Sequence, residues 1–399
     1  MRALSVQRSV PRFGAARLIS TVSARSATRV GPLTLGEIDD PDQPGPGWER
    51  IDTVLSGICG SDLALADGRA SAYFEDWVSF PFVPGHEVVG RRDDGSRVVI
   101  EPVLGHAARG AVPPSPEAAP ADGDDYRHLV TGPLEPGIQT GFCNSTGGGW
   151  APWFWAHESQ LHAVPDGLSD EAAVLVEPLA GGVHAAFSVR DALRRADLLE
   201  RGPLVVGVLG AGTMGLATVA ALRAHVPEAD VVVGARYPHQ FAIARALGAA
   251  EVVRSGDLAA AIRRRTGSHV IGRHLSSGAH CLVDAVGSSD SIAESISMTR
   301  PRGRVVLLGM PADISLDMTP LWHRETELRG CYTYGTEILD DGTAARTFSL
   351  AIDLALSSGA ERLLSATYPI ERHVDALAHA AEAGRRGAVK IAFDLRRGN

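Results

Sequence analysis

The chain has 399 residues, and its length and composition exclude several classes of protein. Hydrophobic residues make up 45% and charged residues 21%, with no apolar run near the ~18 residues that a membrane span needs. The net charge of −9 would repel a phosphate backbone, so neither nucleic acid nor a membrane is expected as a partner. The length suits two domains, and four scattered cysteines indicate reduced thiols or metal ligands in a cytoplasmic protein.

The first half of the chain is predicted to be mostly β. Its N-terminus lacks the long apolar region of a signal peptide and is interpreted as a first strand followed by a loop. Glycines, prolines and short β-like runs such as residues 97–100 follow, and no long helix is predicted before about residue 170. Residues 105–125 combine small residues, prolines and acids with almost nothing to bury, which predicts a surface loop.

From Leu204 the pattern changes to strands that alternate with helices, which is typical of right-handed crossovers and a doubly wound parallel sheet of Rossmann type. Strands are predicted at residues 204–209, 231–233, 251–253, 281–284 and 305–308. Helices are predicted from the end of the first strand to residue 223, and at 240–247 and 258–265. After Tyr334, two amphipathic helices and a closing strand are predicted at residues 345–356, 374–383 and 389–393.

The segment VLGAGTMG at residues 208–215 places G-x-G-x-x-G directly after a predicted strand and at the start of a predicted helix. The glycines of this motif permit a tight turn, close approach of a pyrophosphate and close helix–strand packing, and the helix N-terminus offers free N–H groups to the anion. The surrounding βα units favour dinucleotide binding over a merely structural turn. The predicted cofactor-binding residues are Gly210, Gly212, Thr213, Met214 and Gly215.

The choice between NAD and NADP depends on the end of the second predicted strand, about 20 positions further on. Ala235 stands where an NAD site has an acid that binds the ribose hydroxyls, and Arg236 follows it. The missing carboxylate removes repulsion toward a 2′-phosphate, and a guanidinium can bind that phosphate or stack on adenine. NADP is therefore favoured, with NAD as the alternative and a solvated loop arginine as the structural interpretation of Arg236.

Three short motifs carry residues that suit a metal: GICGSD at residues 57–62, PGHEVVG at 84–90 and VEPLA at 176–180. They contain a cysteine, a histidine and two carboxylates, a set compatible with zinc, which takes S, N and O ligands. Each residue alone has a structural interpretation as a core filler or helix cap. The candidate ligands are Cys59, His86, Glu87 and Glu177.

Together these motifs resemble the zinc-dependent medium-chain alcohol dehydrogenases, in particular the branch of sorbitol and threonine dehydrogenases. The resemblance runs in family order from GICGSD to RGRVVLLGMP, over nearly the whole chain. It implies that Cys59, His86 and Glu177 bind zinc, and that Glu87 either exchanges with water on the metal or lies just behind its ligands. It further implies that Asp62 orients the histidine and that Ser61 passes the alcohol proton toward solvent.

The family resemblance also implies an α/β fold with a GroES-like, mostly-β catalytic domain and a Rossmann domain. The expected ranges are residues 1–184 for the catalytic domain, 185–333 for the Rossmann domain and 334–399 for a segment that returns to the first. A homodimer or homotetramer is expected from the same resemblance. The implied reaction is hydride transfer between the cofactor and a small-molecule alcohol or carbonyl compound, whose identity stays open.

Two departures from the family pattern matter. Ala64 replaces a histidine that many relatives use as the outer station of the proton relay, so no relay is predicted beyond Ser61. No cysteine lies between Cys59 and Cys143, where many relatives hold a second, structural zinc, so only one catalytic zinc is expected. The alternatives are a zinc-free quinone or enoyl reductase and an inactive nucleotide-binding protein. Lys390 is the only lysine among 38 basic residues, and this scarcity of lysine is interpreted as the result of a GC-rich coding sequence rather than of chemistry.

Overall fold

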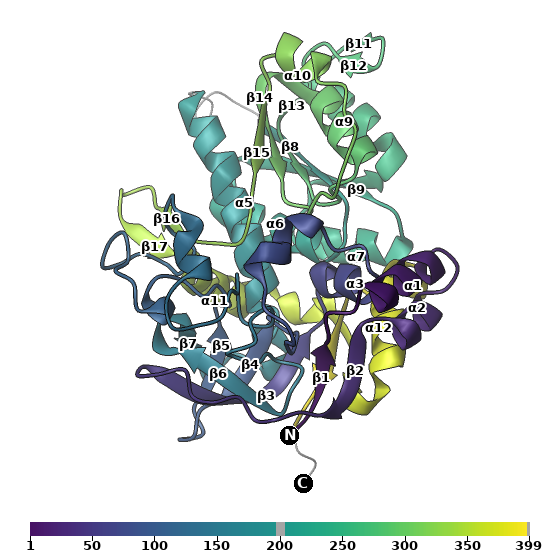
Figure 1. The fold of residues 1–399 in the computed structure, drawn as a ribbon. Coiled ribbons are helices and arrows are strands. Elements are labelled where there is room, and N and C mark those ends of the chain that lie inside the picture. The colour runs from purple at the N-terminus through teal and green to yellow at the C-terminus, as the bar shows by residue number, and fades with distance from the viewer. Residues whose placement is uncertain (197–203, 397–399) are drawn as a thin grey trace. The chain divides into compact units, whose positions relative to one another are not determined.

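The computed structural model describes residues 1–196 and 204–396, and the chain divides into two compact units (Figure 1). Unit 1 consists of Met1–Glu177, Ile338–Leu356 and Leu364–Asn399, and unit 2 of Pro178–Glu337 and Ser357–Leu363. The expected boundary after residue 184 falls inside helix α5 (Val176–Arg195), which runs without a break from one unit into the other.

Unit 2 is built on a six-stranded sheet whose strand pairs are all parallel, in the order β10-β9-β8-β13-β14-β15. This is the Rossmann order 3-2-1-4-5-6, in which the sequence reverses direction at the central strand. The sheet strands are β8 (Leu204–Leu209), β9 (Ala229–Ala235), β10 (Glu251–Arg254), β13 (Ala279–Asp284), β14 (Thr299–Leu307) and β15 (Glu327–Gly330). The small hairpin is β11 (Val270–Ile271) and β12 (His274–Leu275).

The helices of unit 2 follow the strands because each strand is a short apolar run that needs cover on both faces. Every residue of β8 is buried, and so is the central part of α6. All the predicted strands and helices of this part of the chain are present, and α9, α10, β15 and the hairpin of β11 and β12 were not predicted. The helices are α6 (Thr213–His225), α7 (Pro238–Ala246), α8 (Leu258–Thr266), α9 (Ser289–Met298) and α10 (Thr319–His323).

Unit 1 is built on a mostly antiparallel sheet in the order β18-β19-β3-β4-β5-β7, with β6 also paired to β3. Only β18 and β19 run parallel. Its strands are β3 (Trp48–Gly57), β4 (Val88–Arg91), β5 (Arg97–Ile100), β6 (Trp153–His157), β7 (Leu161–Ala163), β18 (Leu364–Pro369) and β19 (Lys390–Asp394). The other regular elements are α4 (Asp170–Ala173), β16 (Thr336–Ile338), β17 (Ala344–Arg346), α11 (Thr347–Ser358) and α12 (His373–Ala381).

The predicted first strand is confirmed, but the prediction that a loop follows it, with no long helix before residue 170, is wrong. Strand β1 (Arg2–Val6) pairs with β2 (Leu33–Glu37), but the connection between them contains helices α1 (Val10–Ser20) and α2 (Ala24–Val30). The inward positions of these helices are small residues such as Ala16 and Ala27, so the apolar periodicity that signals a helix is weak. A third short helix, α3 (Gly60–Ala66), follows β3.

The prediction of a bare surface loop at residues 105–125 is also wrong in part. Ala108, Arg109 and Ala119 are each no more than 2% exposed, and residues 107–109 form a 3₁₀ turn. The segment is held by polar contacts of Arg109, which are described below, rather than by an apolar core of its own. Composition does not reveal such contacts, because they join residues far apart in the chain.

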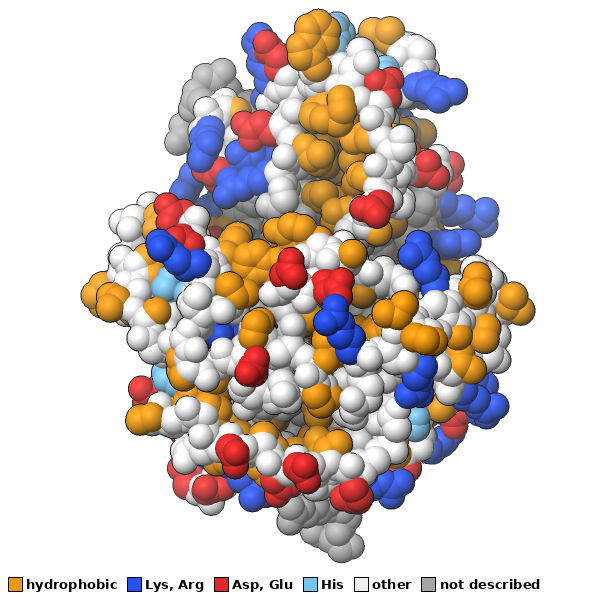
Figure 2. Space-filling view, viewed as in Figure 1, with side chains coloured by type: hydrophobic (Ala, Val, Ile, Leu, Met, Phe, Trp, Pro, Cys, Tyr) orange, Lys and Arg blue, Asp and Glu red, His pale blue; other side chains and the backbone are white. Residues whose placement is uncertain are grey.

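The charged side chains on the face shown in Figure 2 are spread out and do not form one large patch of a single sign. Figure 2 shows acidic and basic side chains interspersed on the visible face, with no continuous basic patch there. None of the described helices is both long and apolar enough to cross a membrane.

Candidate metal and cofactor sites

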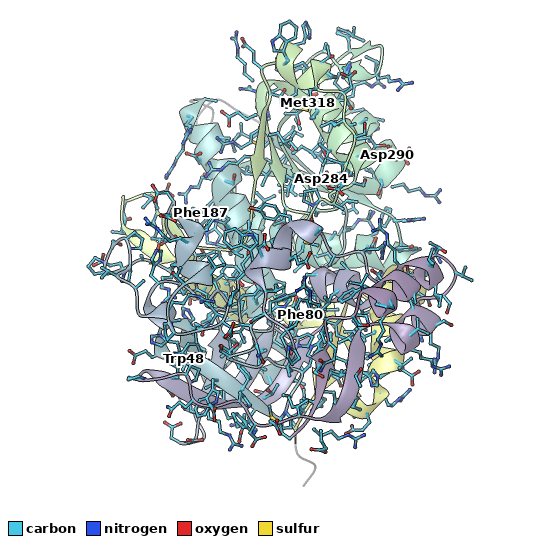
Figure 3. All side chains as sticks on the ribbon, viewed as in Figure 1. Trp48, Phe80, Phe187, Asp284, Asp290 and Met318 are labelled. Atoms are coloured by element: carbon cyan, nitrogen blue, oxygen red, sulfur yellow. The ribbon has the colours of Figure 1, made fainter. Side chains whose placement is uncertain are left out.

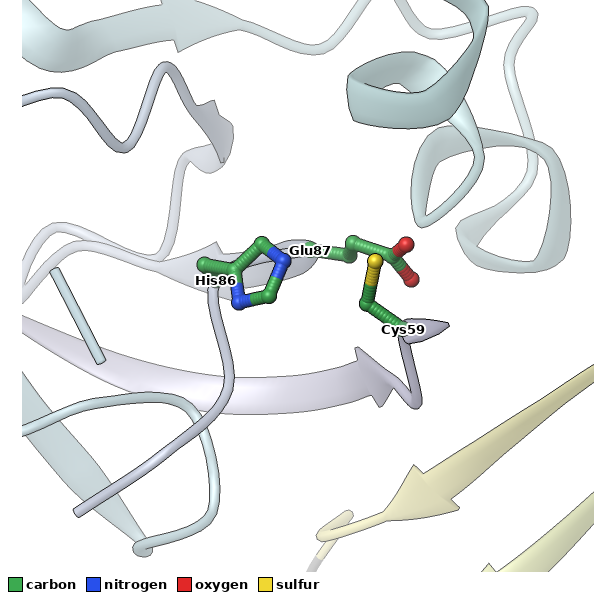
Figure 4. Close-up of side chains that lie close together, drawn as sticks. All are labelled: Cys59, His86 and Glu87. Atoms are coloured by element: carbon green, nitrogen blue, oxygen red, sulfur yellow. The ribbon is translucent and has the colours of Figure 1, made fainter. Parts of the chain in front are cut away.

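The strand pairing of unit 1 brings two of the sequence motifs together. Strand β3 ends at Gly57, two residues before Cys59, and β4 begins at Val88, directly after His86 and Glu87. The antiparallel register pairs Ser56 with Val88, so the end of one motif lies beside the start of the other. The metal-binding atoms of Cys59, His86 and Glu87 all lie within 4.8 Å of one another (Figure 4).

Asp62 connects the cysteine and the histidine of this cluster. It lies in the first turn of α3, where one carboxylate oxygen accepts a hydrogen bond of 2.9 Å from the backbone N–H of Cys59. Its other oxygen lies 3.7 Å from Nδ1 of His86, and Asp62 itself is fully buried. The carboxylate therefore faces the ring nitrogen that points away from Cys59, the position from which a second carboxylate orients a metal-binding histidine.

Lys390 is the residue of this site that the sequence interpretation missed. It begins β19 and forms an ion pair with Glu87, and both side chains are almost completely buried. The only lysine of the chain is thus placed against a candidate ligand. Its uniqueness was the available signal, but its partner lies about 300 positions away in the sequence.

The remaining predicted residues, Glu177 and Ser61, stand near this cluster but outside it. Glu177 is half-buried at the start of α5 and is close enough to His86 and Lys390 to raise the pKa of both. It is not one of the three residues whose donor atoms lie within 4.8 Å. Ser61 is half-buried in the first turn of α3, next to Asp62.

The electrostatics of the cluster show a need for positive charge. Burial lowers the pKa of His86, but Asp62, Cys59 and Glu177 more than reverse this and raise it to about 10. Burial raises the pKa of Asp62. Among the described residues, Asp62 Oδ1 and His86 Nδ1 are buried without a hydrogen-bond partner, whereas Glu87 Oε2 is paired with Lys390. A thiol, an imidazole and carboxylates so arranged fit a zinc ion, which would take the place of the imidazole proton.

The dinucleotide motif forms a tight turn between β8 and α6. Gly210 has a φ of +98°, and a Cβ on Gly215 would overlap the carbonyl oxygen of Gly210. These two glycines are required by the protein's own packing. Gly212 differs, because a Cβ there would meet no described atom within 4 Å. Space next to an exposed turn at a helix N-terminus fits a pyrophosphate.

Thr213 and Met214 open α6 and are half-buried, while Asp284 supports the turn from the neighbouring strand β13. Asp284 is fully buried and accepts hydrogen bonds from the N–H groups of Val286 and Gly287 at 2.8 and 3.0 Å (Figure 3). A Cβ on Gly210 would meet Val286. Asp284 thus fixes the loop that packs against the dinucleotide turn, a role that was not predicted.

At the end of β9, the side chain of Arg236 is exposed and no carboxylate precedes it. Its guanidinium carbon lies 5.6 Å from the centre of the Tyr237 ring. The buried amide of Gln240 accepts hydrogen bonds of 3.0 Å from the backbone N–H groups of Arg236 and Tyr237. The backbone of this loop is therefore fixed while the charged group stays accessible.

Comparison with known proteins matches both units. The model of the GroES-like domain of alcohol dehydrogenases matches residues 45–166, and that of zinc-binding dehydrogenases matches residues 213–357. The sorbitol dehydrogenase of Arabidopsis thaliana is 30% identical over 73% of this chain and 75% of its own length. The chain belongs to the zinc-dependent medium-chain alcohol dehydrogenases. It is an oxidoreductase that acts on alcohol groups of small molecules, and it uses zinc and a nicotinamide cofactor.

Two further comparisons agree with this assignment. The human (Homo sapiens) sorbitol dehydrogenase is 26% identical over 87% of this chain and 89% of its own length. The crystal structure of 2R,3R-butanediol dehydrogenase from Bacillus subtilis superposes with a TM-score of 0.68 at 20% identity, over 98% of this chain and 99% of that one. The GroES-like and Rossmann fold expected from the sequence is thereby confirmed. The zinc-free and inactive alternatives receive no support.

In this dehydrogenase, the lobe of residues 105–143 is held by Arg109. The guanidinium of Arg109 donates hydrogen bonds of 2.8–3.4 Å to the backbone carbonyl oxygens of Thr131, Leu134, Glu135 and Gly137. His106 and His128, two histidines of the lobe, stack with ring centres 3.8 Å apart. Neither belongs to a group of three or more metal-binding side chains among the described residues.

Proposed function

We propose that the chain is an alcohol dehydrogenase that holds a single zinc ion per chain at Cys59, His86 and Glu177 and prefers NADP to NAD. Glu87 is proposed as the carboxylate that exchanges onto the metal or lies directly behind it. The observation that carries the proposal is the cluster of half-buried Cys59 with buried His86 and Glu87, whose donor atoms lie within 4.8 Å of one another.

When bound, zinc supplies Lewis-acid chemistry that makes the alcohol proton more acidic, and the nicotinamide accepts the hydride from the carbinol carbon. The side chains of this chain hold the ligands and move the proton. Asp62 keeps His86 in one orientation from Nδ1. Lys390 neutralises Glu87 and keeps that carboxylate in place. Ser61, next to this carboxylate network, takes the proton from the substrate hydroxyl and passes it to solvent.

The reaction itself is tested with purified protein. We expect oxidation of an alcohol with NADP, followed at the absorbance of the reduced nicotinamide, and loss of this activity on removal of zinc by a chelator. Ser61→Ala should keep zinc and cofactor binding but slow the reaction by about 10²–10⁴-fold, because a positioned proton acceptor is lost. Turnover that survives complete removal of zinc would contradict the proposal.

The cofactor preference rests on Ala235 and Arg236. An uncharged residue at the ribose position with an accessible guanidinium beside it favours the 2′-phosphate of NADP. Arg236→Ala should raise the KM for NADP by about ten- to a hundredfold and change that for NAD little. Arg236→Lys is the matched variant, because it keeps the charge and should restore part of the preference. Equal losses for both cofactors would show that Arg236 only stacks on adenine.

A homodimer or homotetramer is proposed on the family resemblance. Light scattering of the purified protein measures its mass directly, and a mass of one chain would contradict this part of the proposal. A cytoplasmic location stays a prediction from the scattered, unpaired cysteines.

A further inference from the structure

A row of phenylalanine rings leads to the metal cluster of unit 1. The ring of Phe142 lies 5.8 Å from that of His86, measured between ring centres. Phe82 lies 5.3 Å from Phe142, and Phe80 lies 5.1 Å from Phe82. These separations are typical of aromatic rings in contact. The row therefore forms a continuous apolar wall that ends at a candidate zinc ligand.

The two ends of the row are not closed off by the core. Phe82 is buried, whereas Phe80 and Phe142 are half-buried and pack against the core from its border. Figure 3 shows Phe80 near the centre of unit 1. The hydroxyl of Ser79 accepts a hydrogen bond of 2.8 Å from the backbone N–H of Asn144, which ties the segment of Phe80 to that of Phe142. The segments that carry the two ends of the wall are therefore joined by a direct contact.

The charged groups next to the metal cluster are already engaged with one another. Asp62 faces His86 and the backbone of Cys59, and Lys390 is paired with Glu87. The hydroxyl of Ser61 is proposed to take the proton from the reacting hydroxyl group of the substrate. On the side of His86 occupied by Phe142, the described neighbours in the row are carbon rings, which offer no hydrogen bonds to additional hydroxyl groups of a substrate.

This composition discriminates between classes of alcohol. A polyol would have to place hydroxyl groups against aromatic carbon and lose their hydrogen bonds to water, which is unfavourable. An aromatic or bulky apolar group would gain contact area and ring stacking at the same place. The rings therefore favour a substrate with an apolar substituent next to the carbinol carbon.

We propose that the substrates of this dehydrogenase are secondary or primary alcohols that carry an aromatic or bulky apolar group, which packs on Phe142 and Phe80. The inference rests on the proposed function at the same site. The reaction converts the alcohol and NADP⁺ into the carbonyl compound, NADPH and a proton. The hydride leaves the carbinol carbon for the nicotinamide, and the hydroxyl proton leaves through Ser61.

The first test compares 1-phenylethanol with sorbitol and 2-propanol at saturating NADP and full zinc content. We expect kcat/KM for 1-phenylethanol to exceed that for sorbitol by about 10²-fold, because a hydrophobic wall rejects additional hydroxyl groups to about this extent. Sorbitol turned over as efficiently as 1-phenylethanol would overturn the inference while leaving the alcohol dehydrogenase function intact.

The second test uses Phe142→Leu, which keeps an apolar side chain but removes the ring. We expect kcat/KM for 1-phenylethanol to fall about tenfold and that for 2-propanol to stay within twofold. Phe13→Leu is the matched control, because Phe13 is a half-buried phenylalanine that packs against the same core cluster. A uniform fall for both alcohols in Phe142→Leu would indicate structural damage and contradict the assignment.

A binding measurement separates the inference from the reaction. Direct binding of 1-phenylethanol to the zinc-loaded protein, followed by ligand-observed NMR, should weaken about tenfold in Phe142→Leu and stay unchanged in Phe13→Leu. If no alcohol is turned over, the proposed function fails. In that case, weaker binding of 1-phenylethanol to Phe142→Leu than to Phe13→Leu would still support the aromatic wall. Equal binding to the two variants would contradict it.

Discussion

Two regions of unit 1 gather electron-rich atoms around a buried positive charge, and they do so by different means. At the metal cluster, a thiol, an imidazole and a carboxylate have their donor atoms within 4.8 Å of one another, and Lys390 is paired with that carboxylate. In the lobe of residues 105–143, four backbone carbonyl oxygens surround the guanidinium of Arg109. The donor set of the first region fits a zinc ion from solution, whereas the second region is held by a side-chain cation alone.

This difference decides which region depends on metal. Burial lowers the pKa of Arg109, although guanidinium groups stay protonated at any pH that proteins meet. Its planar N–H donors satisfy four carbonyl groups, of which two belong to the buried residues Leu134 and Gly137. We therefore expect the lobe to fold without zinc, with the contacts of Arg109 in place of structural cysteines. At the metal cluster, the chain's own cation is Lys390, which neutralises Glu87.

Substitution of one cysteine in each region is expected to give the largest difference between the two regions. Cys59→Ser should reduce zinc content from about one per chain to near zero and abolish turnover, because a thiolate ligand is lost. Binding of NADPH should persist, since the glycine turn of residues 210–215 belongs to unit 2. Elemental analysis measures the zinc content, and titration with NADPH measures cofactor binding.

Cys143→Ser is the control for this comparison. Cys143 is buried in the lobe, where its thiol donates to the carbonyl oxygen of Glu135, and it lies outside the metal cluster. We expect this variant to retain its zinc and its activity. Two tightly bound zinc ions in the parent protein, one of them lost in Cys143→Ser, would show that the lobe also holds a metal.

The second prediction concerns the cation that the chain supplies at the metal cluster. Lys390→Met leaves Glu87 buried without its partner, which should destabilise the zinc-free protein by about 3–5 kcal/mol. Zinc should offset part of this loss by placing positive charge beside the same carboxylate. We therefore expect the rise in Tm on addition of zinc to be larger in Lys390→Met than in the parent. An equal rise in Tm in the variant and the parent would show that the charge of Glu87 does not interact with the bound zinc.

The sequence predicted unit 2 well and the connections of unit 1 poorly, for a physical reason. Strands such as β8 are uninterrupted apolar runs, and the glycine motif after β8 leaves few alternatives for the backbone. Helices α1 and α2 instead pack through small residues, which give no strong periodic signal. Local patterns thus specify elements that bury large apolar faces, and they miss elements held by close contact of small ones.

The same contrast applies to the candidate site. Cys59 and His86 stand in short motifs, so the sequence predicted them. Lys390 and Arg109 act through partners that only the folded chain brings near, across about 300 positions in one case and 22–28 in the other. Phe142 likewise gains its significance only from its distance to His86. Residues that serve as partners of a site are therefore harder to predict than its ligands.

The third prediction tests the cation of the lobe. Arg109→Met removes the donors for four carbonyl groups and should destabilise the protein by about 3 kcal/mol, measured by denaturant unfolding. Hydrogen exchange should increase in residues 105–143. Arg109→Lys keeps the charge with fewer, less directional donors and should lie between the parent and Arg109→Met. Zinc content should stay the same in both variants, and loss of zinc in step with the lobe would contradict the independence of the two regions.

The smallest effect expected is a pH dependence of the lobe through His128. Burial lowers the pKa of His128, and the neighbouring His106 and Arg109 lower it further, while its contact with Asp125 acts in the opposite direction. The folded lobe therefore prefers the neutral ring.

Above the ordinary histidine pKa of about 6.5, both folded and unfolded forms are neutral and stability does not depend on this group. As the pH falls below that value, the unfolded form takes up the proton first, so the lobe loses stability until the pH reaches the lower pKa of the folded form. Hydrogen exchange of residues 105–143, corrected for intrinsic rates, should therefore accelerate between pH 7.5 and pH 5. His128→Phe keeps an aromatic ring against His106 but cannot take up a proton, so its lobe should lose less stability over the same range. An identical loss in both proteins would assign the acid sensitivity to another group, and a lobe equally protected at both pH values would mean that Arg109 alone determines its stability.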